Sequence, residues 1–316
     1  MAIVATDFGG TEIKIGVVEN GRVIVSTTVN ASAADTIENN LINTTRHIRS
    51  FLKKQNIKES GIEGFGMALP VIVDGEKNTV ITEYVKYRDA KGFDFDKWFR
   101  ENWDIPLQLE NDARAALLGE WQYGAGKGSN DLVMLTLGTG VGSAVLTGGK
   151  LLRGKHNLAG NMIGHTILNF DGVDCNCGSV GCLETEAATW ALPAIAKRIK
   201  SAHQSTLRRK TDLSFKDLAL AIEQGDLFAK DVFDHCIKAW GMCAANLVHS
   251  FDPEKIIVGG GVMKSASKIL PAMQEYVNKH TWLPANSVKI VAAQQSAHAA
   301  LLGMDFLLKQ RIKKNL

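Results

Sequence analysis

The chain has 316 residues, and its 36 Lys and Arg against 33 Asp and Glu give a formal net charge of +3 at pH 7. This near balance argues against a dedicated nucleic-acid binder, because neutralising a phosphate backbone takes a clear excess of basic residues. Hydrophobic residues make up 45% and charged residues 22%, which is ordinary globular usage and excludes a disordered chain. At ~150 residues per domain, the length allows two lobes or one large α/β domain.

The apolar runs are interrupted by Gly, Thr or charged residues well before the ~18 residues that a membrane span needs. Met1 is followed directly by the strand-like Ile3, Val4 and Ala5, with no basic and apolar leader. We therefore expect a cytoplasmic protein.

The first half of the sequence starts as a strand, a glycine turn and two further strands, in which β-branched residues alternate with turn residues. Later apolar runs predict two more strands, and residues at helical spacing predict three helices. The predicted strands are 3–6, 13–18, 23–29, 62–69 and 107–109, and the predicted helices are 33–55, a short one around Trp98, and 113–121, which closes at Gly124.

The second half repeats this opening pattern. Laid over the first hairpin, Asp7 to Gly10 meets Thr136 to Thr139, which indicates a structural duplication. The alternative is that glycine hairpins are common in any β-rich fold. The predicted strands of this half are 132–137, 141–146, 255–258 and 288–291, and the predicted helices are 186–200, 227–250, one after residue 261, and 296–309.

The first hairpin is a candidate phosphate site. It precedes a strand and not a helix, which excludes both the dinucleotide fingerprint and the Walker loop. Two adjacent glycines let backbone N–H groups approach a phosphate closely, a nearby hydroxyl and cation add donors, and a strand-end carboxylate suits Mg²⁺. The alternative is a tight turn with a capping Asp. These residues are Asp7, Gly9, Gly10, Thr11 and Lys14.

Two further glycine turns favour a nucleotide over simple turns. Gly138, Thr139 and Gly140 form a second hairpin with its own N–H donors. Gly260 and Gly261 follow a buried-looking strand and suit close approach of a flat adenine or ribose. Three such surfaces together predict a polyphosphate ligand.

A cysteine cluster predicts a metal. Three of the five cysteines lie within eight residues, with a His shortly upstream, and three thiolates with one imidazole make the closed tetrahedral set of a structural Zn²⁺. The alternative is three unrelated thiols. The proposed ligands are His165, Cys175, Cys177 and Cys182, whereas Cys236 and Cys243 lie on an apolar helix and are core residues.

Asp112 ends the segment Glu110-Asn111-Asp112, where a strand gives way to a helix. A carboxylate in this position can serve as a general base in phosphoryl transfer. It can equally be a helix N-cap, since Asp is favoured there. Both roles fit the spacing.

The motifs DFGGTEIK, END, LGTGVG, CNCGSVGCLE and VGGGV resemble, in this order and over most of the chain, those of the ROK family (repressors, open reading frames and sugar kinases). The resemblance implies an α/β, two-lobe actin-like ATPase (ribonuclease H-like) fold with a structural zinc loop and ATP between the lobes. We expect an N-terminal lobe at 1–120, with the C-terminal helix at 296–316 packing back on it, and a C-terminal lobe at 121–295 that carries the zinc loop.

The resemblance also implies a function. An ATP-dependent sugar kinase would transfer the γ-phosphoryl group of MgATP to a hydroxyl, most often O6, of a hexose or N-acetylhexosamine. Asp112 matches the family's general base. Asn111, His165 and Glu184 match its sugar-binding residues. The implied cofactors are ATP, Mg²⁺ and structural Zn²⁺, and the implied assembly is a homodimer without nucleic-acid or membrane partners.

Three positions depart from the family on the sugar side, whereas the nucleotide motifs are intact. Met162 stands where a Glu is common, Val71 replaces the Gly after Pro70, and 86–89 reads Lys-Tyr-Arg-Asp where an Asn is often offered to the sugar. A sugar-binding pseudokinase and a kinase for a β-glucoside or disaccharide therefore stay as alternatives. A repressor of the family would need ~60–80 residues of DNA-binding domain ahead of the core, and we expect none because Asp7 lies so close to Met1.

Overall fold

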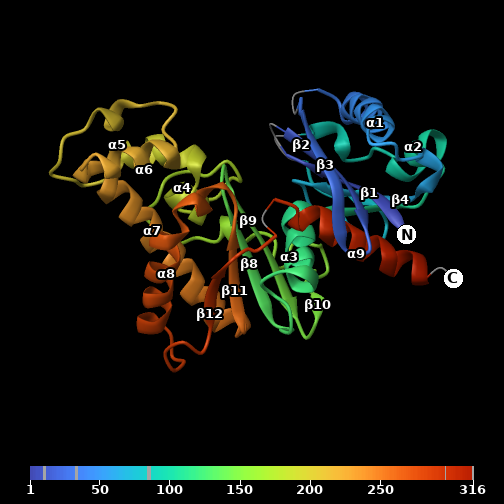
Figure 1. The fold of residues 1–316 in the computed structure, drawn as a ribbon. Coiled ribbons are helices and arrows are strands. Elements are labelled where there is room, and N and C mark those ends of the chain that lie inside the picture. The colour runs from blue at the N-terminus through green and yellow to red at the C-terminus, as the bar shows by residue number, and fades with distance from the viewer. Residues whose placement is uncertain (10–11, 33–34, 84–86, 296, 315–316) are drawn as a thin grey trace. The chain divides into compact units, whose positions relative to one another are not determined.

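The computed structural model describes residues 1–9, 12–32, 35–83, 87–295 and 297–314. The chain forms two compact units, each built on its own five-stranded sheet (Figure 1). The first unit comprises Met1–Gly128, Arg153–Leu158 and Gln294–Leu316, and the second comprises Ser129–Leu152 and Ala159–Ala293.

The sheet of the first unit has the order β3-β2-β1-β4-β7. Its first three strands are antiparallel, whereas β1, β4 and β7 run parallel, so these three end at the same edge. The strands are β1 (Ala2–Phe8), β2 (Glu12–Glu19), β3 (Arg22–Asn30), β4 (Ile62–Leu69) and β7 (Leu107–Asn111), beside a separate two-stranded ribbon of β5 (Val73–Asp74) and β6 (Thr79–Val80).

The sheet of the second unit repeats this plan, with the order β10-β9-β8-β11-β12. Again the first three strands are antiparallel and the last two continue parallel to β8. The repeated topology is what the two similar hairpins in the sequence indicated. The strands are β8 (Leu132–Leu137), β9 (Val141–Thr147), β10 (Lys150–Leu151), β11 (Lys255–Gly259) and β12 (Lys289–Ala292).

The helices form where apolar residues recur at helical spacing behind a capping side chain. In α1, Leu41, Ile48 and Leu52 are buried, and the Thr36 side chain accepts a hydrogen bond from the Asn39 N–H at the N-terminus. The helices of the first unit are α1 (Ile37–Lys54), α2 (Phe95–Asn102), α3 (Asp112–Tyr123) and α9 (Ala299–Lys314). Those of the second are α4 (Leu183–Ala187), α5 (Leu192–Arg198), α6 (Phe215–Glu223), α7 (Leu227–Phe251) and α8 (Ala266–His280). No helix in the described ranges is long and apolar enough to cross a membrane.

The predicted α/β class is confirmed, and the main differences are in the helices of the second unit. The predicted helix at 186–200 is divided into α4 and α5, because Ala188 is extended and Pro193 starts a new helix at its first turn. Helix α6 was not predicted, although Ser214 and Asp217 form a capping box at its start. The predicted starts at Ala33 and Ser296 lie outside the described residues.

Two glycines allow helices α3 and α9 of the first unit to pack backbone against backbone. A Cβ on Gly119 would lie 2.0 Å from the Ala299 carbonyl oxygen, and one on Gly303 would lie 1.8 Å from the Ala115 carbonyl oxygen. Both distances are far below van der Waals contact, so neither position accepts a side chain without a shift of the helices. Helix α3 begins at Asp112, and its placement therefore depends on this crossing.

We predict that Gly303→Ala destabilises the protein by about 1–3 kcal/mol, because the added methyl group forces the two helices apart. Gly61→Ala is the matched control, since a Cβ there has no neighbour within 4 Å, and it should change stability by less than about 0.5 kcal/mol. Urea denaturation measures both. Equal midpoints for the two variants would show that the crossing is not tightly packed.

Candidate active site

The end of strand β7 places Asn111 and Asp112 at the start of α3. Asn111 is the N-cap: its Oδ1 accepts from the N–H groups of Ala113 (3.0 Å) and Arg114 (3.2 Å). Its Nδ2 donates to Asp112 Oδ1 at 3.0 Å. The capping role considered for Asp112 therefore belongs to Asn111, and Asp112 is the first residue of the helix, with the Ala113 N–H donating to its Oδ1 at 2.7 Å.

A buried charge cluster that was not predicted supports this strand end. Glu110 is fully buried, ion-paired with Arg153, and 3.9 Å from the Arg114 guanidinium. Burial lowers the pKa of Arg114 to about 10, against the opposing charge of Glu110. Glu110 also accepts from the Asn111 N–H at 2.9 Å, so the cluster helps to fix the backbone that presents Asp112.

The first glycine hairpin joins β1 to β2. Asp7 pairs in register with Lys14, and their charged groups are 3.7 Å apart. Burial raises the pKa of the Asp7 carboxyl, and the Lys14 charge opposes this. A Cβ on Gly9 would lie 2.6 Å from the Glu12 carbonyl oxygen, so the turn requires glycine. Gly10 and Thr11 lie outside the described residues.

Tyr87 and Asp89, in the segment that departs from the family, have structural contacts. The buried Tyr87 hydroxyl donates to the Gly9 carbonyl at 2.8 Å, and burial with the charge of Asp7 raises its pKa to about 12. Asp89 accepts from the Ile37 N–H at 2.8 Å at the start of α1. Both side chains therefore make contacts within the first unit, and Tyr87 contacts the first glycine hairpin. Lys86 lies outside the described residues.

The second unit gathers its own glycine turns. The Gly138 N–H donates to the Gly140 carbonyl at 3.0 Å within the β8–β9 turn. Strand β11 is parallel to β8 and ends beside it, and a Cβ on Gly260 would lie 2.2 Å from the Leu137 carbonyl oxygen. Gly260 also has φ +95°, which favours glycine. The structure therefore brings the second hairpin and Gly260 to one edge of this sheet, with Gly261 next in the chain.

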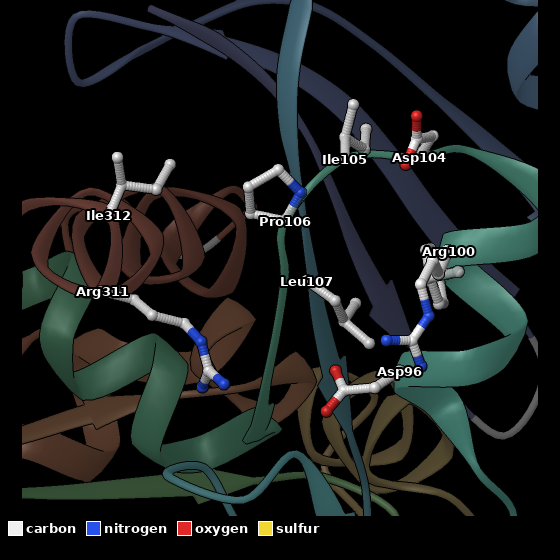
Figure 2. Close-up of a pocket in the computed structure, with 9 residues that line it drawn as sticks. Asp96, Arg100, Asp104, Ile105, Pro106, Leu107, Arg311 and Ile312 are labelled. Carbon is white, nitrogen blue, oxygen red and sulfur yellow. The ribbon is translucent and has the colours of Figure 1, made fainter. Parts of the chain in front are cut away.

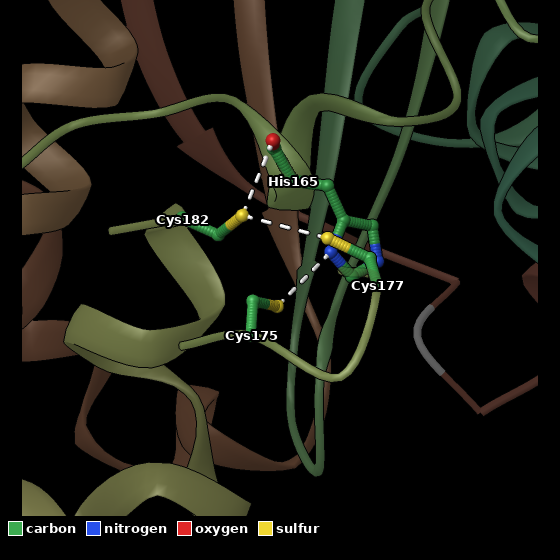
Figure 3. Close-up of side chains that lie close together, drawn as sticks. All are labelled: His165, Cys175, Cys177 and Cys182. Carbon is green, nitrogen blue, oxygen red and sulfur yellow. Dashed lines mark hydrogen bonds between the residues drawn. The ribbon is translucent and has the colours of Figure 1, made fainter. Parts of the chain in front are cut away.

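The four predicted zinc ligands lie together, with one donor atom from each within 4.8 Å of all the others (Figure 3). The His165 Nδ1 is 3.6 Å from Cys175 Sγ, and Cys177 Sγ is 3.7 Å from Cys182 Sγ. In tetrahedral geometry, Zn–S bonds of ~2.3 Å and Zn–N bonds of ~2.0–2.1 Å separate two sulfurs by ~3.8 Å and sulfur from nitrogen by ~3.6 Å. The cluster fits a structural zinc site.

The short loop around the cluster turns at two glycines. Gly178 and Gly181 have φ +88° and +65°, and a Cβ on Gly181 would lie 1.6 Å from the Asn169 carbonyl oxygen. The loop also closes on itself, since the Cys175 N–H donates to the Ser179 carbonyl at 2.7 Å. The close packing of its backbone explains how so short a segment can surround an ion.

We predict about one zinc per chain in freshly purified protein, measured by mass spectrometry of the metal. Cys177→Ala should lower the zinc content strongly, because it removes one of four ligands from an exposed position. Asn176→Ala alters the same loop without removing a ligand and should keep the metal. A wild-type content below about half an equivalent would contradict the zinc assignment.

Helix α4 follows Cys182 directly and carries Glu184, whose side chain is only 5% exposed. The sequence placed Glu184 in the sugar site by resemblance alone. In the structure its carboxylate accepts two hydrogen bonds, from the Val141 N–H in the second hairpin and from the Trp190 indole. Trp190 was not predicted to have a role.

A second carboxylate anchors α4 to its surroundings. Glu186 accepts hydrogen bonds from Arg198 (2.8 and 3.1 Å), and its Oε2 is 3.0 Å from His235 Nε2. Arg198 also donates to the Thr185 carbonyl at 2.7 Å. Burial opposes ionisation of Glu186, but the hydrogen bonds and charges of His235 and Arg198 outweigh it and lower its pKa to about 2. These residues are far apart in the sequence, which gave no signal for the network.

We predict that Glu186→Gln destabilises the protein by about 2 kcal/mol at pH 7, since it removes a buried charge from its partners. The pKa of Glu186 is about 2 in the fold against an ordinary 4.5, so its stabilisation is present above about pH 4.5 and is lost as the pH falls towards 2. Denaturation at pH 7 and at pH 3 should therefore give a smaller difference at pH 3. Asp234→Asn, in an exposed pair with Lys230, should have little effect at either pH.

A cavity of about 530 Å³ lies elsewhere in the first unit, at the start of β7 (Figure 2). Arg100, Arg311 and Asp96 point towards its interior, over an apolar wall that includes Leu107. Asn111 stands at the other end of the same strand. None of the site residues predicted from the sequence lines this cavity.

Two sheets of the same topology, glycine turns at the ends of β1 and β8, and a Cys₃His cluster define a duplicated α/β protein with a metal loop. The family model of the ROK family matches residues 3–311, and the chain belongs to this family. The resemblance inferred from the motifs is thereby confirmed.

The relatives that match this chain over nearly its full length include glucokinases. It is 30% identical to a glucokinase of Halalkalibacterium halodurans, over 98% of this chain and 95% of the relative. It is 31% identical to a glucokinase of Thermotoga maritima, over 99% and 98% of the two chains. The crystal structure of a ROK glucokinase from Streptomyces griseus, in complex with glucose and AMPPNP, superposes with a TM-score of 0.81 at 29% identity and covers 98% of this chain and 100% of that one. These similarities support a sugar kinase.

Proposed function

We propose that this protein transfers the γ-phosphoryl group of MgATP to O6 of a hexose or N-acetylhexosamine, with Asp112 as the general base. The observation that carries the proposal is the geometry at the start of α3. Asn111 caps the helix through the N–H groups of Ala113 and Arg114, so Asp112 is not needed as the cap, and its carboxylate is held by short contacts to Ala113 and Asn111. A base held in this way can take the hydroxyl proton as the phosphoryl group leaves ATP.

The nucleotide-binding groups are proposed on the two hairpins. In the first unit, the Asp7 carboxylate offers an oxygen ligand of the kind that Mg²⁺ prefers, and Lys14 beside it offers a cation to phosphate. Gly9 belongs to the same turn, with Gly10 and Thr11 assigned by the motif alone. In the second unit, Gly138, Thr139 and Gly140 would contact phosphate, and Gly260 and Gly261 the ribose or adenine. When bound, Mg²⁺ would neutralise charge on the transferring phosphate oxygens.

The sugar-binding groups are proposed as Asn111, Asp112, His165 and Glu184. Beside Met162, which stands where a Glu is common in the family, the polar neighbour Asn161 is buried and donates to the Ser143 carbonyl at 2.7 Å. That contact commits Asn161 to strand β9, and neither Asn161 nor Met162 has a carboxylate to offer the sugar. We therefore expect a sugar preference that differs from that of relatives with the Glu. The proposal extends to a cytoplasmic homodimer that binds no nucleic acid.

An ADP-release assay with MgATP and a panel of sugars tests the proposed activity. The panel contains glucose, mannose, N-acetylglucosamine, N-acetylmannosamine, a β-glucoside and 6-deoxyglucose. We expect turnover with at least one hexose or hexosamine and none with 6-deoxyglucose, which lacks O6. Sugar binding without turnover across the panel would contradict the kinase and favour the pseudokinase. Turnover of 6-deoxyglucose would contradict transfer to O6.

We predict that Asp112→Asn lowers kcat by about 10²–10⁴-fold, the usual contribution of a general base. The melting temperature should stay unchanged, because the amide oxygen can still accept from the Ala113 N–H. Asp94→Asn is the matched control, since Asp94 also stands at a helix start and accepts from the Lys97 N–H. Near-normal turnover of the Asp112 variant would contradict its role as the base.

A further inference from the structure

The turn of the second hairpin is held from outside by the segment that follows α4. Thr189 donates twice to the Gly138 carbonyl, from its hydroxyl at 2.7 Å and from its N–H at 3.1 Å. The backbone N–H of Trp190 donates to the Thr139 carbonyl at 3.2 Å. The carbonyl groups of the turn are therefore fixed by 189–190, a segment outside the hairpin itself.

The carboxylate of Glu184 connects the same hairpin to the same segment through side-chain contacts. Its Oε1 accepts from the Val141 N–H at 2.7 Å, and its Oε2 accepts from the Trp190 indole N–H at 3.0 Å. A carboxylate offers about four acceptor positions, so these two bonds leave capacity for sugar hydroxyls. One carboxylate can then contact the sugar, the hairpin and Trp190 at once.

The contact between Glu184 and the hairpin is close. A Cβ on Gly140 would lie 2.4 Å from Glu184 Oε1. The carboxylate therefore packs directly on the backbone of the turn, and a rotation of its side chain must break the bond to Val141 or move the turn. The Trp190 indole limits that rotation by holding the second oxygen.

We propose that Trp190 is a positioning residue that couples sugar binding at Glu184 to nucleotide binding at the Gly138–Gly140 hairpin. The inference rests on the proposed function of the two sites. A sugar that fixes the carboxylate also fixes the hairpin, so sugar and nucleotide each strengthen the binding of the other by the same factor. Without the indole N–H, the Glu184 carboxylate can rotate towards the sugar and release the Val141 N–H, so that this factor falls towards one.

The variant Trp190→Phe tests the proposal, because it keeps an aromatic ring and removes the N–H. Calorimetry measures the affinity for Mg-AMPPNP with and without the panel sugar that the wild type phosphorylates fastest. We expect that sugar to tighten Mg-AMPPNP binding at least 5-fold in the wild type and less than 2-fold in the variant. Trp282→Phe is the matched control, since Trp282 is 96% exposed in the same unit, and it should keep the wild-type ratio.

A second variant guards against a simple loss of structure. Thr189→Val removes the hydroxyl bond to Gly138 with little change of shape, and we expect an intermediate ratio with an unchanged melting temperature. A wild-type ratio in Trp190→Phe would overturn the coupling while leaving the kinase in place. If the sugar does not change the affinity of an active wild type for Mg-AMPPNP, the coupling is likewise overturned while the kinase stays in place. Absence of turnover with every sugar would instead overturn the proposed function, and the coupling with it.

Discussion

The hydrogen bonds of Glu184 join the two chemical features of the second unit. Glu184 stands two residues after Cys182, which belongs to the metal cluster, and its carboxylate bonds to Val141 in the glycine hairpin. Helix α4 has only five residues, too few to be stable by its own hydrogen bonds. Its position depends on the Glu186 network on one side and on the metal loop on the other. Disturbance of either is therefore expected to reach the hairpin.

In the first unit, other contacts fix the end of strand β7 and the start of α3. Its strand end is fixed by the side chain of Asn111, which caps α3, and by the buried Glu110, which faces two arginines. A buried carboxylate is stable only when it is paired, so this cluster tolerates little change. The close packing of α9 on α3 at Gly119 and Gly303 also fixes the position of α3. The result is a rigid support for the carboxylate of Asp112.

Most of the sheets and the metal cluster could be predicted from the sequence. β-Branched runs between glycines mark strands whatever their partners are, and three cysteines within eight residues are rarely accidental. Helix boundaries were less predictable, as the division of 186–200 at Ala188 demonstrates. The strong helix formers in that stretch concealed the break at Ala188, next to which the backbone N–H groups of Thr189 and Trp190 donate to the hairpin.

The contacts that support the site were not predictable, because they join residues far apart in the chain. Tyr87 hydrogen-bonds to Gly9, and His235 hydrogen-bonds to Glu186. In neither case does the local sequence pattern indicate the partner. The same limit explains why the departures on the sugar side were ambiguous in the sequence. In the structure, Tyr87 and Asp89 support the first unit, and Asn161 is committed to strand β9.

A ³¹P NMR spectrum of the wild-type protein with MgATP and each sugar of the panel follows phosphoryl transfer to the sugar itself. For a sugar kinase, we expect the γ-phosphate signal of ATP to be replaced in equal amount by the signal of a phosphate ester on the sugar. Conversion of ATP to ADP and inorganic phosphate, or an unchanged spectrum with every sugar, would contradict it.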